Sequence, residues 1–170
     1  MTRDDERVGL LYGKGQLDVT LPDSAVATVI RKPALPKVSD PGAAIREALD
    51  APVGSPPLRE LAQGRTSACI VICDITRPVP NHLFLRPMVE TLVDAGIPLG
   101  EITVLVANGL HREGDAAEIA ELVGDPWVVE NVRIEGHRAR DRDTLVDLGP
   151  TPTRATPVLI HRSLVEADLR

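Results

Sequence analysis

The sequence predicts a mixed α/β fold: a Rossmann-like, doubly wound, mostly parallel sheet preceded by a small antiparallel β element. Two continuous apolar runs, residues 68–73 and 102–107, have the composition of strands that are buried on both faces. Segments whose apolar residues recur at helical spacing follow each run, and glycine and proline separate the segments. Strands that alternate with helices are typical of a parallel sheet.

The first forty residues predict the antiparallel element. Residues 8–12 are apolar, residues 13–15 (Gly-Lys-Gly) form a turn signal, and residues 17–21 alternate with period two. Residues 25–30 form a third β-rich run, and a proline-containing linker follows. We therefore expect residues 1–40 to be a hairpin and linker that pack on the main domain.

Residues 41–170 are expected to form the main α/β domain. Helical patterns lie at 41–49, 58–63, 83–93 and 115–123, and strand patterns at 68–73, 102–107, 128–134 and, more weakly, 145–148 and 157–160. Asp115 and Glu118 form a capping-box pattern. Residues 163–167 resemble a helical turn, and residues 168–170 resemble the start of another strand. The domain is thus expected to be incomplete at its C-terminal end, with an uncovered sheet edge that favours self-association.

Composition argues against several classes of partner. The net charge is −6 and only three residues are aromatic, whereas nucleic-acid binding favours basic surfaces and exposed rings. No apolar stretch reaches the roughly 18 residues of a membrane helix, and the charged N-terminus lacks the core of a signal peptide. Cys69 and Cys73 would lie about 13 Å apart on one strand, too far for a disulfide. We expect both to be buried and reduced, in a cytoplasmic protein.

Polar residues follow both apolar strands. Asp74-Ile75-Thr76-Arg77 comes after the first strand, and Asn108, His111 and Arg112 come after the second. A right-handed crossover brings both loops to one edge of the sheet, where ligands bind in open α/β folds. Arg77 suits a carboxylate or phosphate, and His111 suits proton exchange with a hydroxyl. Asp74 could orient either residue or accept a ribose hydroxyl. A plain Asx-turn and a structural histidine remain the alternative reading.

The other histidines carry less information. His137 follows the expected third strand and is a possible accessory to the same crevice, although its neighbours read as a solvated charged loop. His82 is a candidate for a capping or surface residue, and His161 only follows a weak strand pattern. No group of His, Cys, Asp or Glu has recognisable metal-ligand spacing, so we predict no metal site within the chain.

At these two loops the sequence resembles the nickel-dependent lactate racemase family (nickel-pincer nucleotide racemases and epimerases), in its N-terminal domain. Residues 74–81 are similar to the family's Asp-x-Thr-Arg-Pro signature, and residues 107–112 to its Gly-x-His-Arg loop. The opening hairpin and residues 165–169 also match in order and spacing. The chain departs from the family at Gly136-His137-Arg138, where Asn-His-Asp is usual, which leaves the role of His137 open.

The resemblance implies an isomerase that interconverts the enantiomers of a small 2-hydroxy acid. The cofactor would be a nickel-pincer nucleotide (pyridinium bisthiocarboxylate mononucleotide), which takes a hydride from the substrate carbon. His111 would be one of two acid/base histidines, Asp74, Ile75, Thr76 and Arg77 would contact the cofactor, and Arg77 would also hold the substrate. In the family the second histidine and the lysine that tethers the cofactor lie beyond the equivalent of Arg170. The chain alone is therefore expected to bind no cofactor and to be inactive.

The sequence is also compatible with two other functions. One is a stand-alone module that binds a nucleotide or a carboxylate without turnover. The other is a subunit whose missing C-terminal half comes from another polypeptide, or that assembles as a homo-oligomer.

Overall fold

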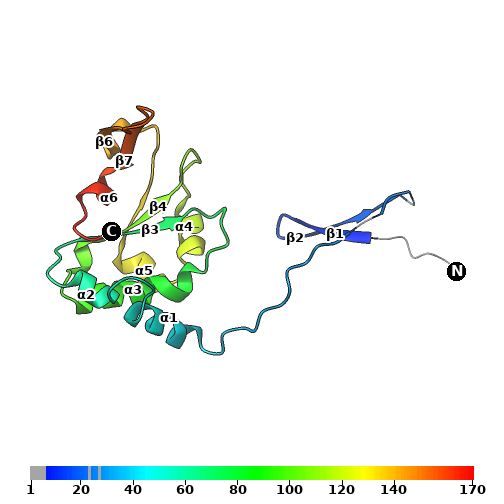
Figure 1. Cartoon of the computed structure of the whole chain (residues 1–170), viewed down its shortest axis with the longest axis horizontal. Coiled ribbons are helices and arrows are strands. Elements are labelled where there is room, and N and C mark those ends of the chain that lie inside the picture. Colours follow the sequence, from blue (N-terminus) through cyan, green and yellow to red (C-terminus); the bar gives the residue numbers. More distant parts are fainter. Residues whose placement is uncertain (1–6, 23, 27) are drawn as a thin grey trace. The chain divides into compact units, whose positions relative to one another are not determined.

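The computed structural model describes residues 7–22, 24–26 and 28–170, which belong to two compact units, Met1–Lys37 and Val38–Arg170 (Figure 1). The predicted packing of residues 1–40 on the main domain stays a prediction.

The first unit contains the predicted antiparallel hairpin. Strand β1 (Arg7–Tyr12) pairs with β2 (Gly15–Thr20). The turn between them uses Gly13 with φ of 56°, a left-handed conformation that glycine adopts without steric cost. The third β run predicted at residues 25–30 is wrong for the described residues of that segment, which form no strand, and residue 27 lies outside the described residues. Val26 is almost fully exposed.

The second unit is built on a three-stranded parallel sheet. Its strands are β3 (Ala68–Cys73), β4 (Ile102–Ala107) and β5 (Arg133–Gly136), in the order β3-β4-β5. Ala68 is opposite Ile102, and Thr103 is opposite Arg133. The mixed α/β class and the two central strands are confirmed. Because all three strands are parallel, their carboxyl ends meet at one edge of the sheet.

The helices begin and end at recognisable signals. They are α1 (Pro41–Asp50), α2 (Leu58–Ala62), α3 (Asn81–Asp94), α4 (Ala116–Val123) and α5 (Pro126–Asn131), with short 3-10 turns η1 (Leu99–Glu101) and η2 (Arg142–Thr144). The predicted capping box opens α4: the Asp115 carboxylate accepts from the backbone N–H of Glu118, whose side chain accepts from the backbone N–H of Asp115. Gly124, with φ of 66°, ends α4 in a left-handed conformation.

Helix α5 corrects the strand predicted at residues 128–134. The first part of that segment is helical, and β5 begins only at Arg133. Asp125 caps the helix by accepting from the backbone N–H of Val128 at 3.2 Å, and Pro126 occupies the first turn, where its missing N–H costs nothing. Val128 is fully buried in the core, so packing outweighs its β preference.

The last two strands lie outside the parallel sheet, and the C-terminal residues return to its edge. Strands β6 (Leu145–Pro150) and β7 (Pro157–His161) form their own antiparallel pair instead of extending a doubly wound sheet. Helix α6 (Arg162–Glu166) follows, and Leu169 then forms a parallel bridge with Ala68 of β3. That bridge agrees with the strand start predicted at residues 168–170.

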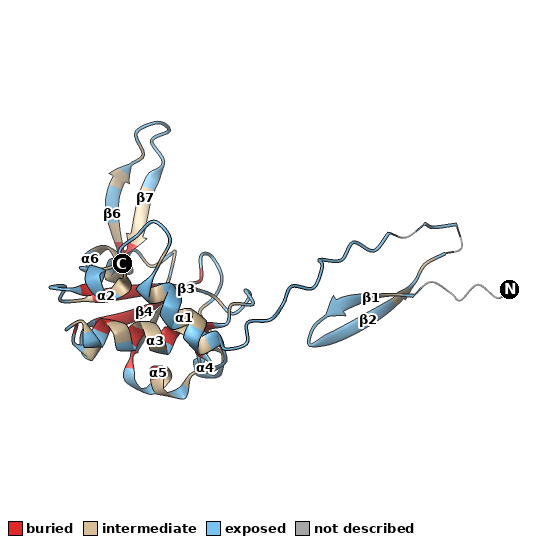
Figure 2. Ribbon diagram, turned by 60° about the horizontal axis from the view of Figure 1, so that its bottom comes forward, coloured by how far each residue is buried: buried red, intermediate tan, exposed pale blue. Residues whose placement is uncertain are grey.

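The two faces of the sheet are covered unequally (Figure 2). One face packs on the main core, to which α3, α4 and α5 contribute. On the other, Cys69 and Leu105 pack against Leu164 and Ala167, in and next to α6. Cys73 lies on this second face and is exposed, so its predicted burial is wrong: Cys73 is not part of the cluster that Leu164 and Ala167 form on this face with Cys69 and Leu105. Within the described ranges, no helix is long and apolar enough to span a bilayer.

Candidate active site

The loop after β3 is a compact turn that presents Asp74. One carboxylate oxygen of Asp74 accepts from the Thr76 hydroxyl at 2.6 Å and from the Thr76 backbone N–H at 3.3 Å. The backbone N–H of Arg77 donates to the Asp74 carbonyl at 3.1 Å, which closes the turn. The second Asp74 carboxylate oxygen remains for a partner from another loop.

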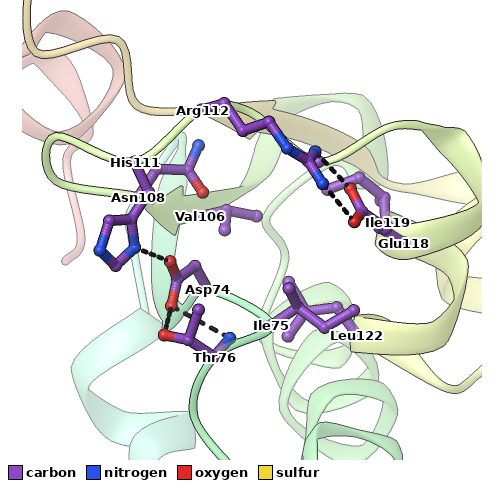
Figure 3. Close-up of a pocket in the computed structure, with 11 residues that line it drawn as sticks. Asp74, Ile75, Thr76, Val106, Asn108, His111, Arg112, Glu118, Ile119 and Leu122 are labelled. Carbon is purple, nitrogen blue, oxygen red and sulfur yellow. Dashed lines mark hydrogen bonds and ion pairs between the residues drawn. The ribbon is translucent and has the colours of Figure 1, made fainter. Parts of the chain in front are cut away.

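That partner is His111, in the loop after β4. The loop leaves the strand at buried Asn108, passes through Gly109 with φ of 58°, and closes where the His111 N–H donates to the Asn108 carbonyl. His111 Nδ1 lies 2.5 Å from Asp74 Oδ2 (Figure 3). Two residues 37 positions apart are thus joined because their strands are neighbours and parallel.

The charge state of Asp74 fixes the direction of this hydrogen bond. The hydrogen bonds from His111 and then Thr76 lower the pKa of Asp74, so its carboxylate is ionised at neutral pH. An ionised carboxylate only accepts hydrogen bonds, so His111 Nδ1 donates. The basic nitrogen of a neutral imidazole is then Nε2. The Asp74 side chain is 13% exposed and that of His111 is 63% exposed, which leaves most of the imidazole open to a ligand.

A small cavity of about 120 Å³ adjoins the pair. Asp74, Thr76, Asn108 and His111 give it polar groups, whereas Val106, Ile119 and Leu122 are apolar (Figure 3). A second, open groove of about 550 Å³ shares His111 and Arg112 with the cavity and includes His137. The groove falls in the size range of ligand pockets, about 300–1,000 Å³, and the cavity falls below it.

The Arg112 guanidinium is already paired with a carboxylate and is therefore not free to bind an anion. Its guanidinium makes two hydrogen bonds to the Glu118 carboxylate, at 2.6 and 2.7 Å. This contact and the backbone N–H of Asp115 lower the pKa of Glu118 to about 2. Sequence reasoning identified Glu118 as a helix cap but missed this ion pair, because a spacing of six residues across a loop follows no helical or strand period.

Of the candidates from the sequence, Asp74, Ile75, Thr76, Asn108, His111 and Arg112 line the cavity. Arg77 is exposed and is not among the lining residues, although its backbone belongs to the same turn. His137 joins only the groove, where its backbone N–H donates to the Val106 carbonyl at 2.9 Å. The apolar wall residues from α4 were not predicted.

The donor set does not fit a resident metal ion. Among the residues that the structure describes, no group of three or more His, Cys, Asp or Glu side chains is arranged to bind one. The Asp74–His111 pair offers one imidazole and one carboxylate already hydrogen-bonded to each other.

Comparison with known proteins assigns the chain to a family. The sequence profile of the lactate racemase N-terminal domain matches residues 12–170, and the chain belongs to that family. It is 34% identical over 125 residues to the lactate racemase of Lactiplantibacillus plantarum, covering 74% of this chain and 29% of that protein. It is 30% identical over 160 residues to the lactate racemase of Thermoanaerobacterium thermosaccharolyticum, covering 93% and 37%. The chain therefore spans about a third of the length of these relatives.

Solved structures agree with the assignment of the fold. The lactate racemase apoprotein of Thermoanaerobacterium thermosaccharolyticum superposes with a TM-score of 0.76 and 26% identity, over 96% of this chain and 38% of that one. A Thermotoga maritima protein superposes with a TM-score of 0.50 and 20% identity over 69% of this chain and 29% of that one, a likeness of fold alone.

Proposed function

We propose that the chain acts as the N-terminal domain of a lactate-racemase-like enzyme that interconverts the enantiomers of a small 2-hydroxy acid. The observation that carries this proposal is the Asp74–His111 pair, held at 2.5 Å by two adjacent parallel strands at the ligand-binding edge of the sheet. Membership of the racemase family gives the reaction class, and the pair supplies the acid/base group that the reaction needs.

His111 would exchange a proton with the substrate hydroxyl. Loss of a hydride from the carbon is easier when the hydroxyl proton leaves at the same time. Asp74 accepts from Nδ1 and so directs Nε2 to the substrate, and it stabilises the imidazolium that forms. Thr76 holds Asp74 in place through a 2.6 Å hydrogen bond.

Arg77 would hold the substrate carboxylate. Its backbone is fixed by the Asp74 turn, whereas its side chain is exposed and extends from that turn. A guanidinium binds a carboxylate through two parallel hydrogen bonds, which fixes orientation as well as charge. The role requires the side chain to turn toward the cavity when substrate binds.

The family resemblance implies a nickel-pincer nucleotide that supplies the hydride acceptor when bound. In this chain the loop Asp74–Arg77 would contact its organic part, and the open groove beside His111 has the volume for a ligand of that kind. Because the described residues contain no metal-ligand cluster, nickel binding would depend on a C-terminal half. The chain would work with that half, in the same or a separate polypeptide, in the cytoplasm.

A chimera tests the proposal. The N-terminal domain of the Thermoanaerobacterium thermosaccharolyticum lactate racemase is replaced by this chain, the cofactor-making machinery is co-expressed, and lactate enantiomers are measured by chiral chromatography. We expect racemisation, reduced about 10²–10⁴-fold by His111→Ala. His82→Ala, a change at an exposed histidine outside the cavity, is the matched control and should leave the rate unchanged. Equal rates for His111→Ala and the parent chimera would remove His111 from the mechanism.

The 170-residue chain alone gives the complementary result. Expressed with the same machinery, it should carry much less than one nickel per chain by elemental analysis and should not racemise lactate. A folded but inactive chimera, together with tight binding of a nucleotide or hydroxy acid by the chain alone, would instead support a binding module without turnover.

A further inference from the structure

The loop that carries His111 is tied at both ends to the segment that follows β5. At its start, the Val106 carbonyl accepts from the His137 N–H at 2.9 Å, and Asn108 Nδ2 lies 3.4 Å from the His137 carbonyl oxygen. At its end, Arg138 Nε donates to Glu113 Oε2 at 2.7 Å. His111 lies between these two attachments.

Gly136 lies against side chains from both ends of the His111 loop. A Cβ atom on Gly136 would lie 2.5 Å from Glu113 Oε1, 2.9 Å from Glu113 Cγ and 3.0 Å from Asn108 Nδ2. Its φ angle is not in the left-handed region, so a side chain at this position would be opposed by the Glu113 and Asn108 side chains, which would have to shift, and not by the backbone conformation. The missing side chain therefore lets both ends of the His111 loop approach β5.

The Glu113–Arg138 pair is partly exposed, with the side chains 37% and 56% accessible. Ion pairs of this kind add little to the free energy of unfolding. If the pair only stabilised the fold, its removal would change the free energy of unfolding very little. A positioning role predicts a different consequence: the fold persists, but the loop loses its fixed place beside Asp74.

We propose that the Glu113–Arg138 ion pair and the space left by Gly136 form a positioning device that holds His111 against Asp74. The catalytic consequence rests on the proposed function, because it matters only if His111 exchanges protons with a substrate. The positioning itself is a property of this chain and is measurable without turnover.

The test uses Glu113→Gln and Gly136→Ala in the 170-residue chain. The matched controls are Glu90→Gln and Gly100→Ala. Glu90 forms a similarly exposed 2.8 Å pair with Arg86, and a Cβ on Gly100 meets open space. Two NMR readouts report the position of His111: amide hydrogen exchange of its N–H, which donates to the Asn108 carbonyl, and the carboxyl ¹³C titration of Asp74.

Both test variants should speed His111 amide exchange about tenfold or more. They should also raise the pKa of Asp74 toward its ordinary value, because the hydrogen bond from His111 is the largest cause of its lowering. The controls should change neither readout, and Glu113→Gln should leave urea unfolding unchanged.

Unchanged exchange and an unchanged Asp74 titration in Glu113→Gln would overturn the positioning proposal, whatever the chimera does. Conversely, an inactive chimera built on a chain that passes this NMR test would count against the proposed function alone. In an active chimera, Glu113→Gln should lower kcat more than it changes KM for the hydroxy acid, since Glu113 lies in the His111 loop and lines the groove proposed for the cofactor, and is not among the residues that line the cavity beside Asp74.

Discussion

Leu85→Ala should destabilise the chain strongly while leaving the site residues in place. Leu85 is fully buried in α3, the helix that follows the Asp74 loop and packs on the sheet. The change removes three carbon groups at about 0.8 kcal/mol each, or about 2.4 kcal/mol of transfer free energy. The cavity left behind raises the loss to about 3–5 kcal/mol. That is a large part of the roughly 5–15 kcal/mol by which a domain is stable.

Leu83→Ala is the matched control, because the same substitution is made two residues earlier in the same helix at a side chain that is 36% exposed. This substitution removes less buried apolar area, and solvent fills the space left behind. The free energy of unfolding should therefore fall by about 1–1.5 kcal/mol. Urea unfolding followed by far-UV circular dichroism measures both. Similar costs for the two variants, or a loss below about 1 kcal/mol for Leu85→Ala, would refute the assignment of Leu85 to the core.

Three further outcomes follow from the site and the sheet. A thiol reagent should modify Cys73 rapidly and Cys69 only after unfolding, because burial raises the pKa of Cys69 to about 11; modification of both thiols in the native chain would contradict this. Glu118→Gln should lower the free energy of unfolding at neutral pH, because the folded state favours ionised Glu118. The difference in free energy of unfolding between the variant and the parent should shrink as pH falls from about 4.5 to about 2, and urea titrations across that range measure it. Arg77→Lys in the chimera should raise KM, since a lysine cannot form the planar two-bond contact; an unchanged KM would exclude the clamp.

The central strands were predictable to the residue. Runs 68–73 and 102–107 contain only apolar residues and threonine, and polar residues bound them, so local composition and tertiary burial favour the same structure. Their adjacency and parallel direction follow from the chirality of crossover connections. These two facts were enough to anticipate that Asp74 and His111 lie at one edge of the sheet.

Helix α5 shows where the reasoning failed. Val128 and Val129 favour the strand predicted at residues 128–134, although Asp125 and Pro126 form a helix-start signal. Burial of Val128 against the core decided the outcome, and local propensity does not contain that information. The exposure of Cys73 has a related origin, because how far α6 extends over β3 is a tertiary property.

The ion pairs around the His111 loop could not be predicted from the sequence, for a different reason. Arg112 with Glu118 and Arg138 with Glu113 join positions that are 6 and 25 residues apart. No periodicity links such positions, and a charged residue in a loop has many possible partners. Only the placement of β5 beside β4 makes the second pair possible.

Glu118 belongs to two structures at once: it closes the capping box of α4 and it binds the Arg112 guanidinium. The beginning of a helix and the end of the loop that bears His111 therefore depend on one carboxylate. Unwinding of the first turn of α4 would release Arg112 in the same event, so helix fraying and loop opening are thermodynamically linked. A ligand that binds the closed loop would, by that linkage, slow hydrogen exchange in the first turn of α4 without touching it.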